Sequence, residues 1–277
     1  NESDSFSSNG NQRKQSLTRS YVNKLIFYYN KLISNENDYF FISTYLPFKI
    51  EILSQIKLGQ LPQYWIKENL KIVKPNSLAR QWSLDNQKKQ LTIFEGVLRR
   101  MIPMHIPTLY LEGYSELEFE VDYKWPKTPK AIFTSNSYMY DDYFKVWAAR
   151  KTQSGTPLII GQHGGHFGMT PFAYHEEHQI TIADKWLSWG WEDNDLPQVI
   201  PFGYFKGLHK NVKYNPKGNA LMVEMSLPRF SYHLFAGPVA SQFLDYIDDQ
   251  KKFIEILPKI IRENLSIRLH PIDYGWD

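Results

Sequence analysis

The segment KAIFTSNSYMYDDYFKVWAARKTQSGTPLIIG, residues 130–161, decides the fold class. KAIFTS (130–135) and TPLIIG (156–161) are short apolar runs that predict buried strands, and residues 141–155 between them predict a helix. Asp141 and Asp142 fall in the first turn of that helix, where carboxylates interact favourably with the helix dipole. A strand, a helix and a strand within about 30 residues predict a βαβ unit of a parallel sheet.

The same signals extend in both directions from this unit. Helices are predicted at 20–33, 48–62, 89–102 (ending before Pro103), 237–249 and 251–263. Strands are predicted at 38–47, 180–184, 185–190, 220–226 and 266–270. The alternation of strands and helices indicates an α/β protein with mostly parallel sheets.

The chain divides into four parts by composition. Residues 1–20 are polar and rich in Ser and Asn, which predicts a disordered tail or linker. We expect an N-terminal Rossmann-like α/β domain at 21–205, a polar linker at 206–218 and the start of a second Rossmann-like domain at 219–277. Because the chain begins with Asn1 and ends soon after a strand signal, we expect it to be a fragment of a longer protein.

Composition excludes several classes of protein. The 277 residues are 42% hydrophobic and 16% aromatic, which is enough for real cores. The net charge of +3 is spread along the chain, so a nucleic-acid partner is not expected. The chain has no cysteine, which excludes disulfides and thiolate catalysis. Its apolar runs are far shorter than the roughly 18 residues of a membrane span, so a soluble, cytoplasmic protein is expected.

The loop GQHGGHFG (161–168) is the leading candidate for a functional site. It directly follows a predicted strand, and ligands of open parallel sheets bind beyond the carboxyl ends of strands. Its glycines either let the backbone approach a ligand or satisfy a tight turn. The candidate ligand-binding residues here are Gln162, Gly164, Gly165 and His166, and His163 is the candidate catalytic residue.

Other chemistries for this loop find less support. The pairs His163/His166 and His175/His178 could bind a metal, but their i, i+3 spacing differs from the i, i+4 spacing of helical zinc pairs, so no metal is expected. HGG resembles an esterase oxyanion loop, yet the chain lacks a G-x-S-x-G nucleophile elbow. A P-loop and a G-x-G-x-x-G fingerprint are also missing.

Further polar residues lie at other predicted strand ends. Ser135 and Asn136 follow the strand at 130–135, where they recognise hydroxyls or cap the next helix, and Asp142 is a candidate general base. Glu112 lies between aromatic residues without a nearby charge in sequence, which predicts a raised pKa suited to acid–base catalysis or else a surface position. Arg268 and His270, at the end of the last strand, are candidates for binding phosphate.

Several separated motifs resemble a family of transferases found in bacterial surface-polysaccharide and O-antigen gene clusters. They are STYLP (43–47), LGQLPQYW (58–65), YLEGY (110–114), WPKTPKAIFTSNS (125–137), FKVWAARK (144–151), GTPLIIGQHGGHFG (155–168), LSWGW (187–191) and RLHPIDYGW (268–276). His270-Pro271 is also similar to the His-Pro pair of sialyltransferases and Kdo transferases, whose His contacts the phosphate of a CMP-sugar.

The resemblance implies a two-domain glycosyltransferase of GT-B type. Such an enzyme moves a sugar, here a nonulosonic acid or a Kdo-type sugar, from a nucleotide-sugar donor to a surface-polysaccharide acceptor, and needs no cofactor. The donor implied by the His-Pro pair is CMP-linked, and the resemblance is compatible with peripheral membrane association. Two alternatives from other classes are a non-catalytic sugar- or nucleotide-binding module and a histidine-based metal hydrolase.

Overall fold

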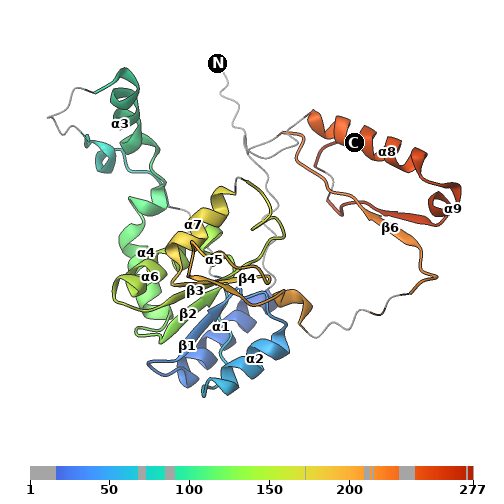
Figure 1. The fold of residues 1–277 in the computed structure, drawn as a ribbon. Coiled ribbons are helices and arrows are strands. Elements are labelled where there is room, and N and C mark those ends of the chain that lie inside the picture. The colour runs from blue at the N-terminus through green and yellow to red at the C-terminus, as the bar shows by residue number, and fades with distance from the viewer. Residues whose placement is uncertain are drawn as a thin grey trace. The chain divides into compact units, whose positions relative to one another are not determined.

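The computed structural model describes residues 17–67, 73–84, 91–171, 173–208, 213, 215–230, 241–272 and 274–276. The chain forms two compact units, residues 1–210 and 211–277 (Figure 1). Most of the predicted tail, part of the 206–218 linker and the first residues of the helix predicted at 237–249 lie outside the described residues.

A five-stranded parallel sheet organises the first unit. Its strands are β1 (Tyr39–Ile42), β2 (Ala131–Thr134), β3 (Leu158–Gly161), β4 (Lys185–Ser188) and β5 (Val199–Pro201). They lie side by side in chain order, and the register places Phe40 opposite Ile132 and Ile132 opposite Leu158. The predicted α/β class with a parallel sheet is therefore confirmed.

This strand order determines where the helices pack. A strand order that never reverses, combined with right-handed crossovers, puts at least one helix of each helical crossover on the same face of the sheet. Leu117 of α4 (Tyr114–Lys124), Trp147 of α6 (Asp142–Gln153) and Ile180 of α7 (Tyr174–Ile182) all join the same core (Figure 1). The reversal at which doubly wound sheets bind dinucleotides does not occur among the five described strands.

The period of two along each strand separates two cores. Phe40, Ile132 and Ile160 point to the helix-covered face, whereas Phe41 and Phe133 point to the other face. The second face is bordered by α2 (Phe48–Lys57) and the short 3₁₀ helix η3 (Phe205–Gly207), and it keeps an apolar groove of about 300 Å³.

The remaining elements of the first unit are short or peripheral. They are α1 (Leu17–Ile33), η1 (Leu78–Arg80), α3 (Ile93–His105), η2 (Thr108–Tyr110) and α5 (Ser137–Tyr140). The sequence patterns did not predict α4, α5, β5 or the 3₁₀ turns. Among the residues that the structure describes, no helix combines the length and the apolar character that crossing a bilayer requires.

Four predicted elements differ from the structure. Residues 180–182 end helix α7 and are not part of a strand, because burial of Ile180 on the sheet outweighs the β-propensity of an Ile-Thr-Ile run. Helix α3 continues past Pro103 to His105, because the guanidinium group of Arg80 binds the carbonyl groups at its end. The helices predicted at 237–249 and 251–263 are one helix, α8 (Gln242–Ile256), followed by the short α9 (Lys259–Arg262).

The second unit is a single βαβ unit in the described residues. Strands β6 (Ala220–Val223) and β7 (Leu265–Arg268) pair in parallel, and α8 and α9 connect them. Phe243 of α8 is buried, and the centre of its ring lies 5.1 Å from that of Trp276.

We expect the core around β1 to carry much of the stability of the first unit. Phe40 is 1% exposed, and its ring lies 4.3 Å from Trp147 and 5.2 Å from both Trp65 and Trp125, centre to centre. Phe40→Ala should lower the free energy of unfolding by about 3–5 kcal/mol, because it removes the ring and leaves a cavity.

Chemical denaturation followed by tryptophan fluorescence measures this effect. The matched control is Phe119→Ala, since Phe119 is 71% exposed on α4 and its loss should change stability by about 0.5 kcal/mol or less. Equal effects of the two substitutions would contradict the assignment of Phe40 to the core.

Candidate functional site

The loops that follow β1, β2, β3 and β4 meet at one edge of the sheet. Parallel strands bring all their carboxyl ends to the same side, which is where open sheets bind ligands. Residues 43–46 follow β1, residues 135–136 follow β2, residues 162–168 follow β3 and residues 189–191 follow β4. The predicted site residues Ser135, Asn136, His163 and their neighbours are therefore brought together.

Gln162 links the loop after β3 to the loop after β4. Its side chain is buried, and Oε1 accepts hydrogen bonds from Trp189 N at 2.7 Å and from Trp191 Nε1 at 3.1 Å. Its Nε2 donates to Gly164 O at 2.7 Å. The carboxamide is engaged by the protein, so Gln162 positions the loop.

The glycine pair lets aromatic and imidazole rings pack against the loop. A Cβ atom at Gly164 would lie 3.2 Å from Nδ1 of His166, and one at Gly165 would lie 3.4 Å from the ring of Trp189. In the described part of the chain, no acceptor lies within hydrogen-bonding reach of either glycine N–H. Anion binding by these amides stays a prediction of the sequence.

His163 is half-buried directly beyond β3. Burial lowers the pKa of its imidazole, and the nearby His166 and His175 lower it further, whereas a hydrogen bond with the Ser135 backbone acts in the opposite direction. Its Nδ1 is buried and has no partner among the described residues, so the bond to Ser135 falls to Nε2. The ring is therefore neutral, with Nε2 protonated and Nδ1 as its unprotonated nitrogen.

Tyr45 lies beside His163 and contacts two further polar side chains. The ring of Tyr45 lies 6.2 Å from the imidazole, centre to centre, and Asn136 Nδ2 donates to the Tyr45 hydroxyl at 2.7 Å. Lys206 Nζ lies 4.1 Å from the centre of the Tyr45 ring. Sequence patterns missed both residues: Tyr45 falls inside the strand predicted at 38–47, and Lys206 falls in the predicted linker.

The loop after β1 adopts an unusual backbone conformation. Ser43 and Tyr45 have φ values of 49° and 60°, a left-handed region that costs a residue other than glycine about 1–3 kcal/mol. Ser135 holds this loop, because its N–H donates to Ser43 O at 3.0 Å and its Oγ donates to Thr44 O at 2.8 Å. Ser135 therefore positions the loop that carries Tyr45.

A cavity of about 510 Å³ opens beside the same loop. The loop contributes Ser43, Thr44 and Tyr45 to its wall, and Glu51 and Lys67 add a carboxyl and an amine. The Thr44 hydroxyl donates to Glu51, and burial raises the pKa of Glu51 although this hydrogen bond opposes the rise. Because Tyr45 lines the cavity and also faces His163, the two places belong to one candidate site.

The other histidines do not form a metal site in the described residues. Burial lowers the pKa of His175, and the neighbouring His166 and His178 lower it further. Across the described ranges, no group of three or more His, Asp and Glu side chains has a geometry that could hold a metal ion. The metal hydrolase hypothesis therefore gains no support from these residues.

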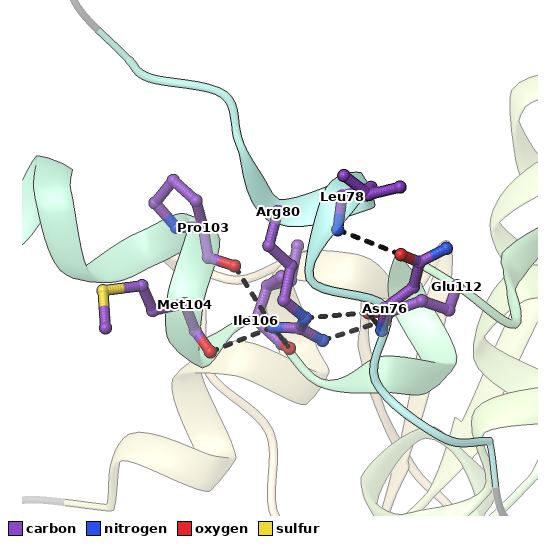
Figure 2. A network of polar contacts seen from close by, with 7 residues as sticks. All are labelled: Asn76, Leu78, Arg80, Pro103, Met104, Ile106 and Glu112. Atoms are coloured by element: carbon purple, nitrogen blue, oxygen red, sulfur yellow. Dashed lines mark hydrogen bonds and ion pairs between the residues drawn. The ribbon is translucent and has the colours of Figure 1, made fainter.

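Glu112 lies away from the site, in an ion pair with Arg80 (Figure 2). Arg80 Nε and one terminal nitrogen donate to the two carboxylate oxygens at 2.7 and 2.8 Å, and Asn76 N donates at 2.8 Å. These hydrogen bonds lower the pKa of Glu112 to about 2. The predicted raised pKa is wrong, because its partner lies 32 residues upstream and is invisible to local sequence patterns.

The two adjacent aspartates have opposite electrostatic environments. Asp142 Oδ1 accepts hydrogen bonds from Tyr110 Oη at 2.6 Å and Lys145 Nζ at 3.0 Å, and these outweigh burial and lower its pKa. Asp141 caps α6 by accepting from Phe144 N, while its Oδ2 is buried without a partner in the described residues. Burial raises the pKa of Asp141 to about 6, so the group that titrates near neutral pH is Asp141.

Arg268 and His270 lie in the second unit, at the carboxyl end of β7. Nδ1 of His270 lies 3.2 Å from Ile272 N and 3.3 Å from Ile272 O. The amide N–H can only donate, so Nδ1 is the acceptor and Nε2 carries the proton. Both side chains are exposed, and Arg268 has no carboxylate partner among the described residues.

Asp141 should make stability depend on pH in a direction set by its raised pKa. The folded-state pKa of about 6 exceeds the usual 3.8, so its contribution to stability is full below about pH 4 and is lost as the pH rises through 6. Asp141→Asn keeps a capping oxygen and removes the titration. The free energy of unfolding of the Asp141→Asn variant minus that of the wild type should therefore increase by about 1.4 kcal/mol between pH 5 and pH 8.

Denaturant titrations at several pH values measure this difference. Asp142→Asn is the matched control with the opposite sign, because the lowered pKa of Asp142 adds stability above pH 3.8 that is lost as the pH falls. A pH-independent difference for Asp141→Asn would contradict the buried, unpartnered carboxyl.

Comparison with known proteins supplies the family. No curated protein and no solved structure matches the chain. A family model described as LIC12162 family transferase matches residues 1–277, the whole of this sequence. A parallel α/β sheet with polar loops at its carboxyl edge agrees with a transferase. The chain belongs to the LIC12162 family of transferases.

Proposed function

We propose that the protein is a glycosyltransferase that moves a sugar from a nucleotide-sugar donor to a surface-polysaccharide acceptor. The observation that carries this proposal is His163, whose Nδ1 is unpaired in the described residues and whose pKa is lowered, at the carboxyl edge of β3. Membership of a transferase family and the resemblance of the chain's motifs to polysaccharide transferases support the choice of reaction.

In this reaction His163 acts as the general base. The acceptor hydroxyl attacks the anomeric carbon of the donor sugar while Nδ1 of His163 takes the hydroxyl proton, which requires the side chains that bury Nδ1 to move when the acceptor binds. A carbon–oxygen bond to the acceptor forms, the bond between the sugar and the phosphate breaks, and the nucleotide leaves with the electron pair. The amides of Gly164 and Gly165, which have no hydrogen-bond partner in the described residues, supply donors that stabilise the negative charge of the leaving phosphate.

The donor nucleotide is assigned to the second unit. A GT-B enzyme has a second Rossmann-like domain, and the βαβ unit of β6, α8 and β7 supports its presence here. His270 has a protonated Nε2 that can donate to a phosphate oxygen, and Arg268 supplies a cation without a carboxylate partner among the described residues. The His-Pro pair favours a CMP-linked nonulosonic acid or Kdo-type sugar as the donor.

Removal of the base should abolish transfer without unfolding the protein. We expect His163→Ala to lower kcat by about 10²- to 10⁴-fold, the usual contribution of general base catalysis. The assay measures nucleotide release from CMP-, UDP-, GDP- and dTDP-sugars in the presence of the glycan acceptor. The matched control is His105→Ala, because His105 is exposed at the end of α3 and should be dispensable.

The pH profile separates the base from a purely structural histidine. The base must be neutral, and the pKa of His163 lies below 6.5, so activity should hold at pH 7 and fall on an acid limb centred below pH 6.5. A folded His163→Ala variant with wild-type kcat would refute the catalytic role. A wild-type protein that binds donor without any turnover would favour the non-catalytic binding module.

Donor binding should depend on the second unit. A CMP-sugar at 100 times its Kd should stabilise the native protein by about 2.7 kcal/mol and raise its Tm. His270→Ala should remove this shift, whereas Lys259→Ala, on an exposed part of α9, should retain it. Thermal unfolding with each nucleotide sugar tests both points, and failure of every nucleotide to raise the Tm would count against a nucleotide-sugar enzyme.

A further inference from the structure

Helix α3 exposes a continuous apolar surface that the proposed reaction does not use. At 100° per residue, six side chains fall within an arc of about 140° on one side of the helix. Each is between 39% and 90% exposed: Ile93, Phe94, Val97, Leu98, Met101 and Met104. The central part of this arc contains no polar side chain. The arc therefore differs from a helix face that is exposed only to water.

The segment before α3 is fixed to the helix and exposes further apolar side chains. Leu78 is 74% exposed, and Trp82 and Leu84 are also exposed. Arg99 donates to Leu84 O at 2.8 Å, and Arg80 donates to the carbonyl groups of residues 103, 104 and 106 at 3.0–3.1 Å (Figure 2). We call residues 78–84 and 93–105 the docking module.

The charges of the docking module are mainly positive. Arg99 and Arg100 follow one another on α3, and Arg100 lies at the edge of the apolar arc. The acidic residue of the helix, Glu95, is held in a capping box with Thr92 at the N-terminal end. Glu112 neutralises Arg80. An apolar face with an arginine at its edge complements a surface that has an apolar interior and an anionic outer layer.

We propose that the docking module binds the surface of an anionic lipid membrane. The apolar arc enters the boundary between headgroups and acyl chains, and Arg100, at the edge of the arc, faces lipid phosphates. A helix of 13 residues is about 20 Å long, shorter than the roughly 30 Å of the hydrocarbon core, so it lies in the plane of the membrane. This inference goes beyond the proposed reaction and does not depend on it.

Vesicle co-sedimentation of the full chain tests the proposal. Vesicles of phosphatidylcholine mixed with phosphatidylglycerol should bind the protein more tightly than vesicles of phosphatidylcholine alone, and added salt should weaken the difference. Leu98→Glu places a charge in the apolar arc and should weaken binding to both vesicles by about tenfold or more. Arg100→Gln should weaken binding only to the anionic vesicles, by about fivefold.

A matched control and a second measurement complete the test. Ile256→Glu introduces the same charge at an exposed apolar position, on α8 of the other unit, and should bind vesicles like wild type. Circular dichroism checks that each variant is folded. Failure of wild type to bind anionic vesicles would overturn the proposal. So would sedimentation velocity that finds a wild-type dimer and a monomeric Leu98→Glu variant, because the surface would then bind a second copy.

Discussion

The candidate site depends on the buried carboxamide of Gln162. Its hydrogen bonds to Trp189, Trp191 and Gly164 join two loops that the sheet alone would only bring near each other. A buried amide left without partners costs about 1–3 kcal/mol, so this network selects one loop conformation over the alternatives. His163 is the next residue in the chain, and its position follows from that of Gln162.

Burial and mutual repulsion then set the chemistry of the histidines. His163 and His175 share the neighbour His166, and a charge on any of them raises the cost of a charge on the others. Keeping a proton off His163 is what a general base requires, whereas a metal centre requires several rings that converge on one point. The described histidines meet the first condition and not the second.

The sequence predicted what local patterns encode. The strands at 131–134 and 158–161 were predictable because buried parallel strands are continuous apolar runs, and the His163 loop because it follows one of them. Residues 180–182 were wrongly predicted to form a strand, because the β-propensity of these residues has less influence than the burial of the helix that contains them. The Arg80–Glu112 pair, the approach of Lys206 to Tyr45 and the Gln162 network join distant parts of the chain, so no local pattern could reveal them.

Asp141 and Asp142 are neighbours at the start of α6, but their pKa values are shifted in opposite directions. They are adjacent in sequence, yet the hydroxyl of Tyr110 and the amine of Lys145 stabilise the charge of Asp142, while burial leaves one oxygen of Asp141 unpaired. Groups whose pKa values are pushed apart in this way serve acid–base chemistry at neutral pH. Asp141 senses the charge of Lys67, which lines the cavity beside Tyr45, and Tyr45 in turn faces His163. The carboxyl group that titrates near pH 6 therefore lies within electrostatic reach of the cavity that Tyr45 lines, and the ring of Tyr45 also lies beside the imidazole of His163.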